Sequence, residues 1–433
     1  MKKMLYRTGR TGIVLALMIF VFILHAQAEI DGVTGTSFNL TAKDGYISTP
    51  DGGSIYTWGY ALDGGPMQYP GPTLILQQGS TVTVTLTNEL PAVAGNVSIV
   101  FPGHQVSATG GVTGYLTREA PPDGVTTVTY RFTATHPGTY TYYSGTRHDL
   151  QVEMGLVGAI IARSNTPKQV YNHPDTAYDH EYLFLLTEMD PKIHISCAFG
   201  QVDDIDTTEY FPVYWFINGR NMPDTMFPAF APWLPHQPYN CLPRMRPGER
   251  LLMRIIGGGR DLHPFHPHGN NTLIIARDGR LLESAPGSGP DLAVSDFTIT
   301  VAPGETIDAI FEWTGKDLGW DIYGTGPGYE HECVDNDGDG YDDTTFEYCA
   351  DHGKPFPVTL PGQQELTVGG MYSGSSFLGD LSALPPGEGG LNLNGGYFFM
   401  WHSHNEKEIV NNDIFPGGLM TNLIVEPPGT PIP

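Results

Sequence analysis

Hydrophobic and polar residues alternate one by one in several short stretches of the chain. The clearest stretch is Thr81–Thr87, where threonine alternates with valine and leucine, and residues 127–133 and 296–301 follow the same pattern. Because successive side chains of a strand point to opposite faces, each stretch predicts a half-buried β-strand. Frequent glycine and proline between the stretches predict turns. Many short strands separated by turns indicate an all-β chain built from β-sandwiches.

The chain divides into two halves with parallel features. The first half, residues 29–163, ends on the apolar run 154–161, and the second half, residues 178–433, ends on a similar run at 418–425. Residues 164–177 are the predicted linker. A chain of 433 residues exceeds what one hydrophobic core normally holds, so we expect two domains.

The second half is interrupted by residues 316–393, which are rich in Gly, Asp, Pro and Tyr and too long for an ordinary loop. We predict an insertion with structure of its own. Its segment DNDGDGYDD, residues 335–343, offers alternate carboxylates as hard oxygen ligands and therefore predicts a calcium site. The predicted ligands are Asp335, Asp337, Asp339, Tyr341 through its carbonyl, and Asp343.

The glutamate that closes an EF-hand is displaced here, because Phe346 stands at the twelfth position of the loop and Glu347 follows it. This favours a structural calcium loop over a regulatory EF-hand. The alternative is a solvated acidic turn.

Residues 1–28 have the pattern of a secretory signal peptide. Basic residues precede an apolar run at 13–24, and Ala26-Gln-Ala28 supplies small residues for cleavage. The apolar run is short for a membrane span, although a retained anchor is the alternative. No later segment approaches that length, so we expect export to the periplasm, the cell surface or the extracellular space.

The formal net charge is -25, and the four basic residues of the signal are lost on cleavage, which makes the mature chain more acidic still. This balance argues against nucleic acid or an anionic membrane surface as a partner. It leaves open a homo-oligomer and a redox or extracellular protein partner.

The chain contains four cysteines, which in an exported protein suggest two disulfides. Sequence proximity favours Cys333–Cys349, which closes a short loop around the predicted calcium site. The remaining pair is Cys197–Cys241. The alternative is that the cysteines are thiolate metal ligands, but none lies within a histidine cluster or forms a close pair.

Two short histidine clusters carry the main chemical signal. The first contains His263, His266 and His268, and the second contains His402 and His404. Imidazole is a common ligand of copper, zinc, iron and nickel. Because strand side chains alternate, His266 and His268 share one face, as do His402 and His404. Two such strands could hold one metal site between them.

With its two sandwich halves and these motifs, the chain resembles the multicopper oxidases over nearly all of its length except the signal and the insertion. The resemblance implies two cupredoxin-like Greek-key sandwiches with copper bound by four motifs, two in each half. His263 matches a type 1 copper ligand, His266 a type 2 ligand and His268 a type 3 ligand. In the fourth motif, His402 and His404 match type 3 ligands, and Met420 could match the weak axial ligand of type 1 copper.

The chain also departs from this family pattern. Ser403 stands where the family has the type 1 cysteine, and no histidine follows His404. A hydroxyl cannot replace the thiolate of a blue-copper site. In the first half, the positions that match histidine ligands are Val100, Pro102, Tyr143 and Gly145. We therefore expect no type 1 copper, no complete trinuclear cluster and loss of the usual oxidase activity.

What remains is a predicted residual copper site with fewer than four ions, held by His266, His268, His402 and His404, with His263 as a further candidate. It would face the domain interface, where His104 or His148 could join it. Such a protein could retain oxidoreductase or metal-handling activity. Two alternatives stay open: a noncatalytic, calcium-stabilised extracellular scaffold or adhesion module, in which the histidines are only hydrogen-bonded residues, and an active laccase-like oxidase.

Overall fold

The structure is a computed structural model that describes residues 30–358, 372–374, 377–378 and 394–432. The predicted signal peptide and most of residues 359–393 of the predicted insertion lie outside the described residues. No helix in the described ranges is both long and apolar enough to cross a bilayer.

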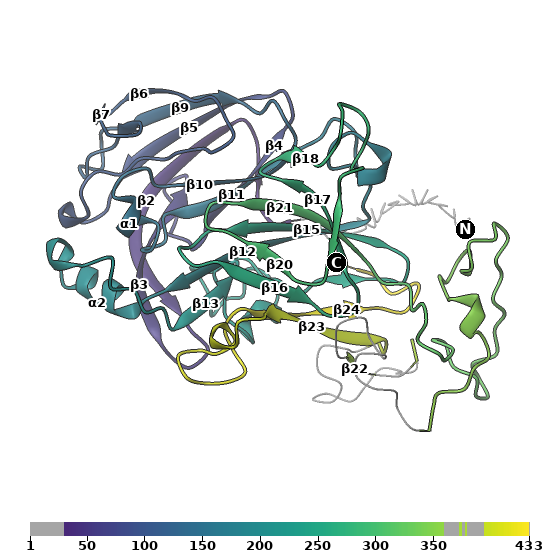
Figure 1. Cartoon of the computed structure of the whole chain (residues 1–433). Coiled ribbons are helices and arrows are strands. Elements are labelled where there is room, and N and C mark those ends of the chain that lie inside the picture. Colours follow the sequence, from purple (N-terminus) through teal and green to yellow (C-terminus); the bar gives the residue numbers. More distant parts are fainter. Residues whose placement is uncertain (1–29, 359–371, 375–376, 379–393, 433) are drawn as a thin grey trace, which may run out of the picture.

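Two facing sheets form the first half, with strand orders β1-β4-β11-β10 and β3-β2-β5-β9-β6 (Figure 1). Strands β7 and β8 form a separate hairpin. The elements are β1 (Val33–Thr34), β2 (Ser37–Ser48), β3 (Ser54–Leu62), β4 (Gly71–Gln77), β5 (Thr81–Asn88), η1 (Ala92–Ala94), β6 (Ser107–Gly110), β7 (Val112–Thr113), β8 (Arg118–Glu119), β9 (Val128–Thr133), β10 (Gly138–Tyr143), α1 (His148–Gln151) and β11 (Val157–Arg163).

Two further sheets form the second half, with orders β13-β12-β15-β21-β17-β18 and β14-β24-β23-β16-β20. Strand β19 adds to β17, and β22 adds to β23. The strands are β12 (His180–Met189), β13 (Tyr214–Ile217), β14 (Arg244–Met245), β15 (Arg250–Gly257), β16 (His263–Pro267), β17 (Thr272–Arg277), β18 (Arg280–Leu281), β19 (Val294–Asp296), β20 (Ile299–Val301), β21 (Thr306–Glu312), β22 (Tyr372–Gly374), β23 (Tyr397–Ser403) and β24 (Met420–Val425). The helices from residue 174 onward are η2 (Pro174–Thr176), α2 (Pro191–Ala198), η3 (Val202–Asp204), η4 (Asp224–Met226), η5 (Cys349–Asp351) and η6 (Glu406–Glu408).

The all-β sandwich prediction is confirmed, and the alternating stretches explain it. In β5 every second residue is buried, so Val82, Val84 and Leu86 enter the first core while the threonines between them stay partly exposed. In β23, Phe399 and Trp401 likewise enter the core of the second sandwich. Each sheet therefore buries one face against its partner sheet.

The two halves meet through their inner sheets. Ile161 of β11 packs with Leu185 of β12 and Ile256 of β15. Beside them, the buried guanidinium of Arg254 forms ion pairs with Glu181 at 2.8 Å and with Asp308 at 3.4 Å. The sheet that contains β16 and β23 lies on the other side of the second core, away from this contact (Figure 1).

One predicted strand is divided. Residues 296–301 do not form a single strand, because β19 pairs with β17 in the inner sheet and β20 pairs with β16 in the outer sheet. The chain crosses between the sheets at Phe297, whose side chain is 58% exposed. A strand cannot continue through that crossing, so the alternation there spans two elements.

One of the two predicted disulfides is present. Cys333 and Cys349 are bonded, but Cys197 and Cys241 are free, so that pairing was wrong. The reason is their location: Cys197, on α2, packs in the core of the first sandwich, whereas Cys241 packs in the core of the second. Elimination by sequence could not place two buried thiols in different cores.

We therefore expect two titratable thiols per chain when the unreduced protein is denatured in the presence of a thiol reagent. The native protein should react slowly, because both side chains are buried and burial raises the pKa of each thiol. The measurement is a thiol count before and after denaturation. A count of zero thiols in denaturant would show that Cys197 and Cys241 are bonded to each other.

Candidate metal centre

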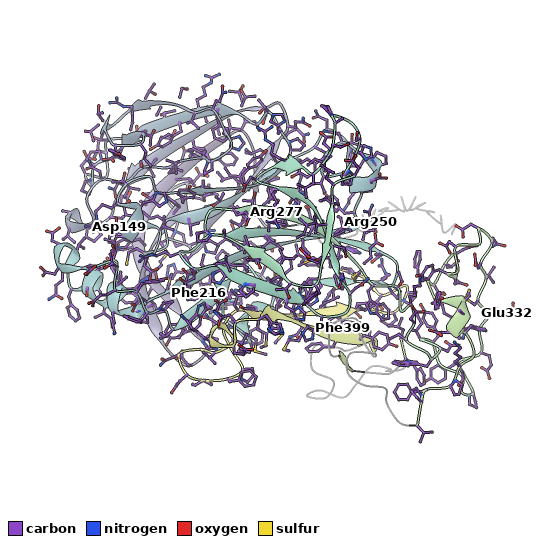
Figure 2. The ribbon with its side chains drawn as sticks, in the orientation of Figure 1. Asp149, Phe216, Arg250, Arg277, Glu332 and Phe399 are labelled. Atoms are coloured by element: carbon purple, nitrogen blue, oxygen red, sulfur yellow. A yellow bond between two sulfur atoms is a disulfide. The ribbon has the colours of Figure 1, made fainter. Side chains whose placement is uncertain are left out.

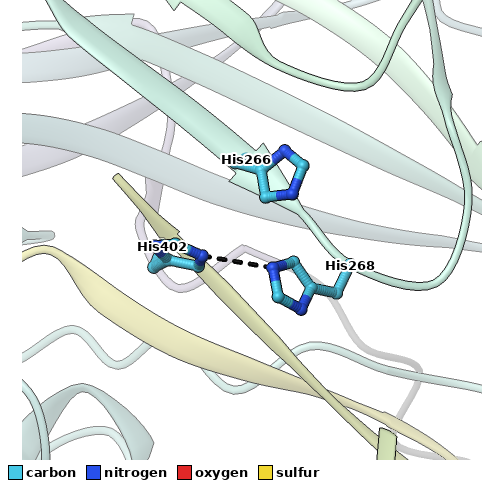
Figure 3. Close-up of side chains that lie close together, drawn as sticks. All are labelled: His266, His268 and His402. Atoms are coloured by element: carbon cyan, nitrogen blue, oxygen red, sulfur yellow. Dashed lines mark hydrogen bonds between the residues drawn. The ribbon is translucent and has the colours of Figure 1, made fainter. Parts of the chain in front are cut away.

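Three imidazoles from the two histidine clusters converge on the outer face of the second sandwich (Figure 3). The pairing of β16 with β23 sets His266 directly opposite His402, and His268 follows at the end of β16. One ring nitrogen of each lies within 4.8 Å of those of the other two. The Nε2 atoms of His268 and His402 are 3.1 Å apart. We call these three residues the histidine trio.

Backbone carbonyls fix the orientation of two of these rings. Nδ1 of His266 donates to the Phe297 carbonyl at 2.7 Å, and Nδ1 of His402 donates to the Ser403 carbonyl at 2.6 Å. With the proton on Nδ1, Nε2 of each ring keeps its lone pair. Metal-binding histidines in proteins commonly have this second hydrogen bond, which sets the tautomer and the ring orientation.

The trio is buried, and its member His402 favours the neutral imidazole form. Exposed fractions are 4% for His266, 7% for His268 and 8% for His402. Burial, together with the neighbouring His266 and His404, lowers the pKa of His402 to about 4, against the opposing effect of its hydrogen bond to Ser403. A neutral ring at neutral pH is the form that binds metal. The residues therefore fit a metal ion that prefers nitrogen ligands.

His404 lies beside the trio rather than within it. Its ring centroid is 5.0 Å from that of His266 and 5.7 Å from that of His402, but its side chain is exposed and its nitrogens do not converge with the other three. Its assignment as a ligand stays a prediction.

The trio does not face the domain interface, contrary to our expectation. It lies on β16 and β23, whereas the first half packs against the other sheet. Neither of the expected additional histidines joins it: the His104 ring packs on Phe132 and Tyr140, and the His148 ring packs on Tyr143.

His263 occupies a different environment, on the inner face of the same sheet. Its Nε2 donates to Glu188 and its Nδ1 donates to Glu408, each at 2.9 Å, and all three residues are buried. Because both ring nitrogens face carboxylates, both act as donors and the ring is an imidazolium. We call these three residues the inner ion triad. Both ring nitrogens of His263 are thus engaged in ion pairs, away from the trio.

The pKa values of this triad follow from burial and pairing. Burial alone would lower the pKa of His263, but its hydrogen bonds to Glu188 and Glu408 and their charges raise it to about 10. Burial would raise the pKa of Glu188, yet the bond to His263 lowers it below its usual value. Ser403 adds a hydroxyl that donates to Glu408 at 2.6 Å. His263 and Ser403, which match type 1 copper ligands in the family pattern, are thus part of a hydrogen-bonded ion cluster.

Met420 is not part of this inner cluster. It pairs in register with His402, so its side chain shares the outer face with that histidine, while the preceding Leu419 enters the core. The sequence did not identify Glu188 or Glu408. Nothing in their local motifs marks them, because their role arises only where β12 and η6 meet β16.

In the first half, the two segments that match copper motifs do lie side by side. Val100 and Tyr143 form an isolated bridge, with the amide of Val100 donating to the Tyr143 carbonyl at 2.9 Å. Val100, Pro102, Tyr143 and Gly145 offer no imidazole there. The topology of the motifs is kept, but their ligand chemistry is absent at these positions.

The predicted calcium loop brings three of its carboxylates together. Oxygens of Asp335, Asp337 and Asp343 lie within 4.8 Å of one another. Asp335 also accepts the amides of Gly338 at 2.6 Å and Gly340 at 2.9 Å. The carboxylate of Asp339 accepts the amide of Tyr341 at 2.8 Å and is not in the three-carboxylate group.

Comparisons with known proteins agree with the fold. A family profile described as multicopper oxidase matches residues 58–167. The chain is 26% identical over 310 residues to "Copper resistance protein A" of Escherichia coli, covering 65% of this chain and 45% of that protein. It is 31% identical over 166 residues to a copper resistance protein A homolog of Pseudomonas syringae pv. tomato, covering 38% of this chain and 25% of that protein. The chain thus spans less than half the length of these relatives.

Two solved structures share the architecture. One is a blue copper oxidase from Nitrosomonas europaea, with a TM-score of 0.54 and 18% identity, covering 90% of this chain and 85% of that one. The other is the multicopper oxidase mgLAC, with a TM-score of 0.53 and 17% identity, covering 92% and 87% of the two chains. At this level of identity the similarity shows the fold.

We predict that replacing His263 by Gln destabilises the protein by about 3–5 kcal/mol, because it leaves two buried carboxylates without their cation. The folded-state pKa of His263, about 10, lies above that of a free histidine. Its stabilisation is therefore complete below the unfolded pKa of about 6.5 and is lost as pH rises to about 10.

The measurement is denaturant unfolding of both proteins from pH 6 to pH 10, with the exposed His136→Gln as the control. The stability gap between wild type and His263→Gln should narrow steadily with rising pH. A gap that does not change with pH would show that His263 is neutral in the folded protein.

Proposed function

Because this chain is a member of the multicopper oxidase family with cupredoxin-like domains, we propose that it is a copper-binding protein that holds one copper ion at the histidine trio. The observation that carries this proposal is the convergence of three buried imidazoles, two of them oriented by backbone carbonyls. Its activity would be metal handling or one-electron redox chemistry, which a bound copper ion would supply.

The chemistry of the donors supports copper. Imidazole binds both copper and zinc, whereas a thioether is a soft ligand that favours Cu(I). Met420 lies across from His402 in the strand ladder, and directly paired residues have Cβ atoms about 4.5–5.5 Å apart. The relatives named as copper resistance proteins point the same way.

The inner ion triad supports the absence of ordinary oxidase activity. A blue-copper centre needs a cysteine thiolate, and Ser403 instead donates its hydroxyl to Glu408. His263, which would be a type 1 ligand, has both nitrogens bound to carboxylates. An electron would have no type 1 copper through which to enter, so a laccase-like reaction is the weaker candidate.

The noncatalytic scaffold is the second candidate function, and the insertion favours it. A disulfide and three converging carboxylates are features of a stabilised extracellular module. Both candidate functions include the calcium site and export from the cytoplasm. Both also include a further protein partner or a homo-oligomer. The two candidates differ in whether the histidine trio binds copper.

We expect the double variant His266→Ala/His402→Ala to retain about one copper ion per chain fewer than the wild-type protein after copper loading and desalting. Removing His266 and His402 leaves His268 as the only imidazole of the trio, which is too few ligands to hold the ion through desalting. The measurement is elemental analysis, with thermal unfolding of each variant to confirm that it is folded.

His136→Ala is the matched control, because it removes one exposed imidazole from the first half. His404→Ala then tests the remaining predicted ligand, and weaker binding without loss of the ion would make it an auxiliary ligand. Equal copper retention by the wild type and the double variant would contradict the proposed site, and three or four ions in the wild type would favour the oxidase.

For the acidic loop, we predict that millimolar calcium raises the midpoint of thermal unfolding and that Asp335→Asn with Asp337→Asn abolishes the increase. These substitutions remove two of the three converging charges while keeping side-chain size. Asp63→Asn, on an exposed turn of the first half, is the control. An equal calcium effect in all three proteins would leave the loop as a solvated acidic turn.

A further inference from the structure

A second cluster of metal-ligand residues lies in the insertion, apart from the histidine trio and the acidic loop. It consists of Asp321, His331, Glu347 and His352, whose ligand atoms all lie within 4.8 Å of one another. Figure 2 marks Glu332, the neighbour of His331, at the far end of the insertion, well away from Phe399 of β23. Nothing in the family resemblance or in the histidine motifs assigns a role to these four side chains.

The distances between the imidazole nitrogens and the carboxylate oxygens suit one small ion, with each carboxylate presenting a different oxygen to each ring. Nε2 of His331 lies 3.4 Å from Asp321 and 3.2 Å from Glu347, and Nδ1 of His352 lies 3.5 Å and 3.0 Å from the same two carboxylates. In a tetrahedral zinc site with bonds of about 2.0–2.1 Å, neighbouring ligand atoms are about 3.3 Å apart. The observed separations bracket that value.

The ligands are also held in place by the surrounding backbone. Nδ1 of His331 donates to the Tyr329 carbonyl at 2.7 Å, which leaves Nε2 directed at the carboxylates. The two oxygens of Asp321 accept the amides of Tyr323 at 2.9 Å and Gly353 at 2.8 Å.

The Cys333–Cys349 disulfide joins the two segments that carry the other ligands. Cys333 lies two residues after His331, and Cys349 lies between Glu347 and His352. This bond limits how far the segments can separate, so it helps to hold the cluster together.

The charge of the cluster calls for a cation. Asp321 and Glu347 are each 1% exposed, and within the described ranges their ion pairs are with His331 and His352 alone. If both rings are neutral, two buried negative charges lack compensation, which is costly. A divalent ion balances them, and two imidazoles with two carboxylates form a donor set that zinc accepts.

We propose that Asp321, His331, Glu347 and His352 bind a divalent transition metal ion of the zinc type, as a structural site that stabilises the insertion. All four positions of a tetrahedron are then filled by protein, which is the mark of a structural rather than a catalytic site. The partial exposure of the two imidazole side chains, 24% and 33%, gives the ion a path from solvent. This inference goes beyond the copper proposal and is independent of it.

The test uses the full chain with His266→Ala/His402→Ala as the background, so that the histidine trio cannot bind zinc. After dialysis against zinc and calcium together and then desalting, this background should retain about one zinc ion per chain by elemental analysis. Calcium keeps the acidic loop occupied. Adding His331→Gln and His352→Gln should remove that zinc ion, because only two carboxylates remain as ligands.

Two further variants guard against a folding defect. His352→Gln alone changes a side chain that is one-third exposed and should already weaken zinc retention, while His136→Gln should leave it unchanged. Zinc should also raise the unfolding midpoint of the background and of the background with His136→Gln. It should not raise the midpoint of the variant that lacks both His331 and His352. If the background retains no zinc, or retains it without His331 and His352, the cluster is an ion pair of carboxylates with protonated histidines and the proposal is wrong.

Discussion

The antiparallel pairing of β16 with β23 is the constraint on which both histidine environments depend. Its register sets His266 opposite His402, and strand alternation then directs these two rings to the outer face. The same alternation directs His263 and Ser403 to the inner face. A shift of one residue in one strand would break both groups at once. One ladder therefore separates a candidate metal centre from a buried ion cluster a few residues away.

The inner face shows how a buried histidine is satisfied by protein groups alone. Without a thiolate, a lone His263 would be a buried polar side chain with unsatisfied nitrogens, which costs free energy. Glu188 from the end of β12 and Glu408 from η6 satisfy both nitrogens, and backbone amides of residues 260 and 261 satisfy Glu188 in turn. These hydrogen bonds link β12, β16 and η6 in the interior of the second sandwich.

The sequence predicted the features that depend on local pattern. Strand alternation identified β5 and β9, and the two histidine motifs identified the residues of the trio, because a motif fixes which side chains share a strand face. It failed where distant segments meet. The free thiols of Cys197 and Cys241 lie in separate cores, and the trio lies away from the domain contact.

The cluster in the insertion was missed for the same reason. Asp321, His331, Glu347 and His352 have irregular spacing and no regular strand or helix to place them on one face, so they form no motif. Only the fold of the loop and its disulfide bring them together. A sequence signal was present in retrospect, since His331 and Glu347 each stand two residues before a cysteine of the predicted Cys333–Cys349 pair.

X-ray absorption at the copper edge of the copper-loaded protein would distinguish copper held by the histidine trio from a type 1 or multinuclear centre, because it reports the atoms that surround the ion. We predict scattering from imidazole rings around a single copper, with no short copper–thiolate bond and no neighbouring copper. A short copper–thiolate bond or a copper–copper vector would contradict this prediction, since the first would require a type 1 centre and the second a multinuclear one.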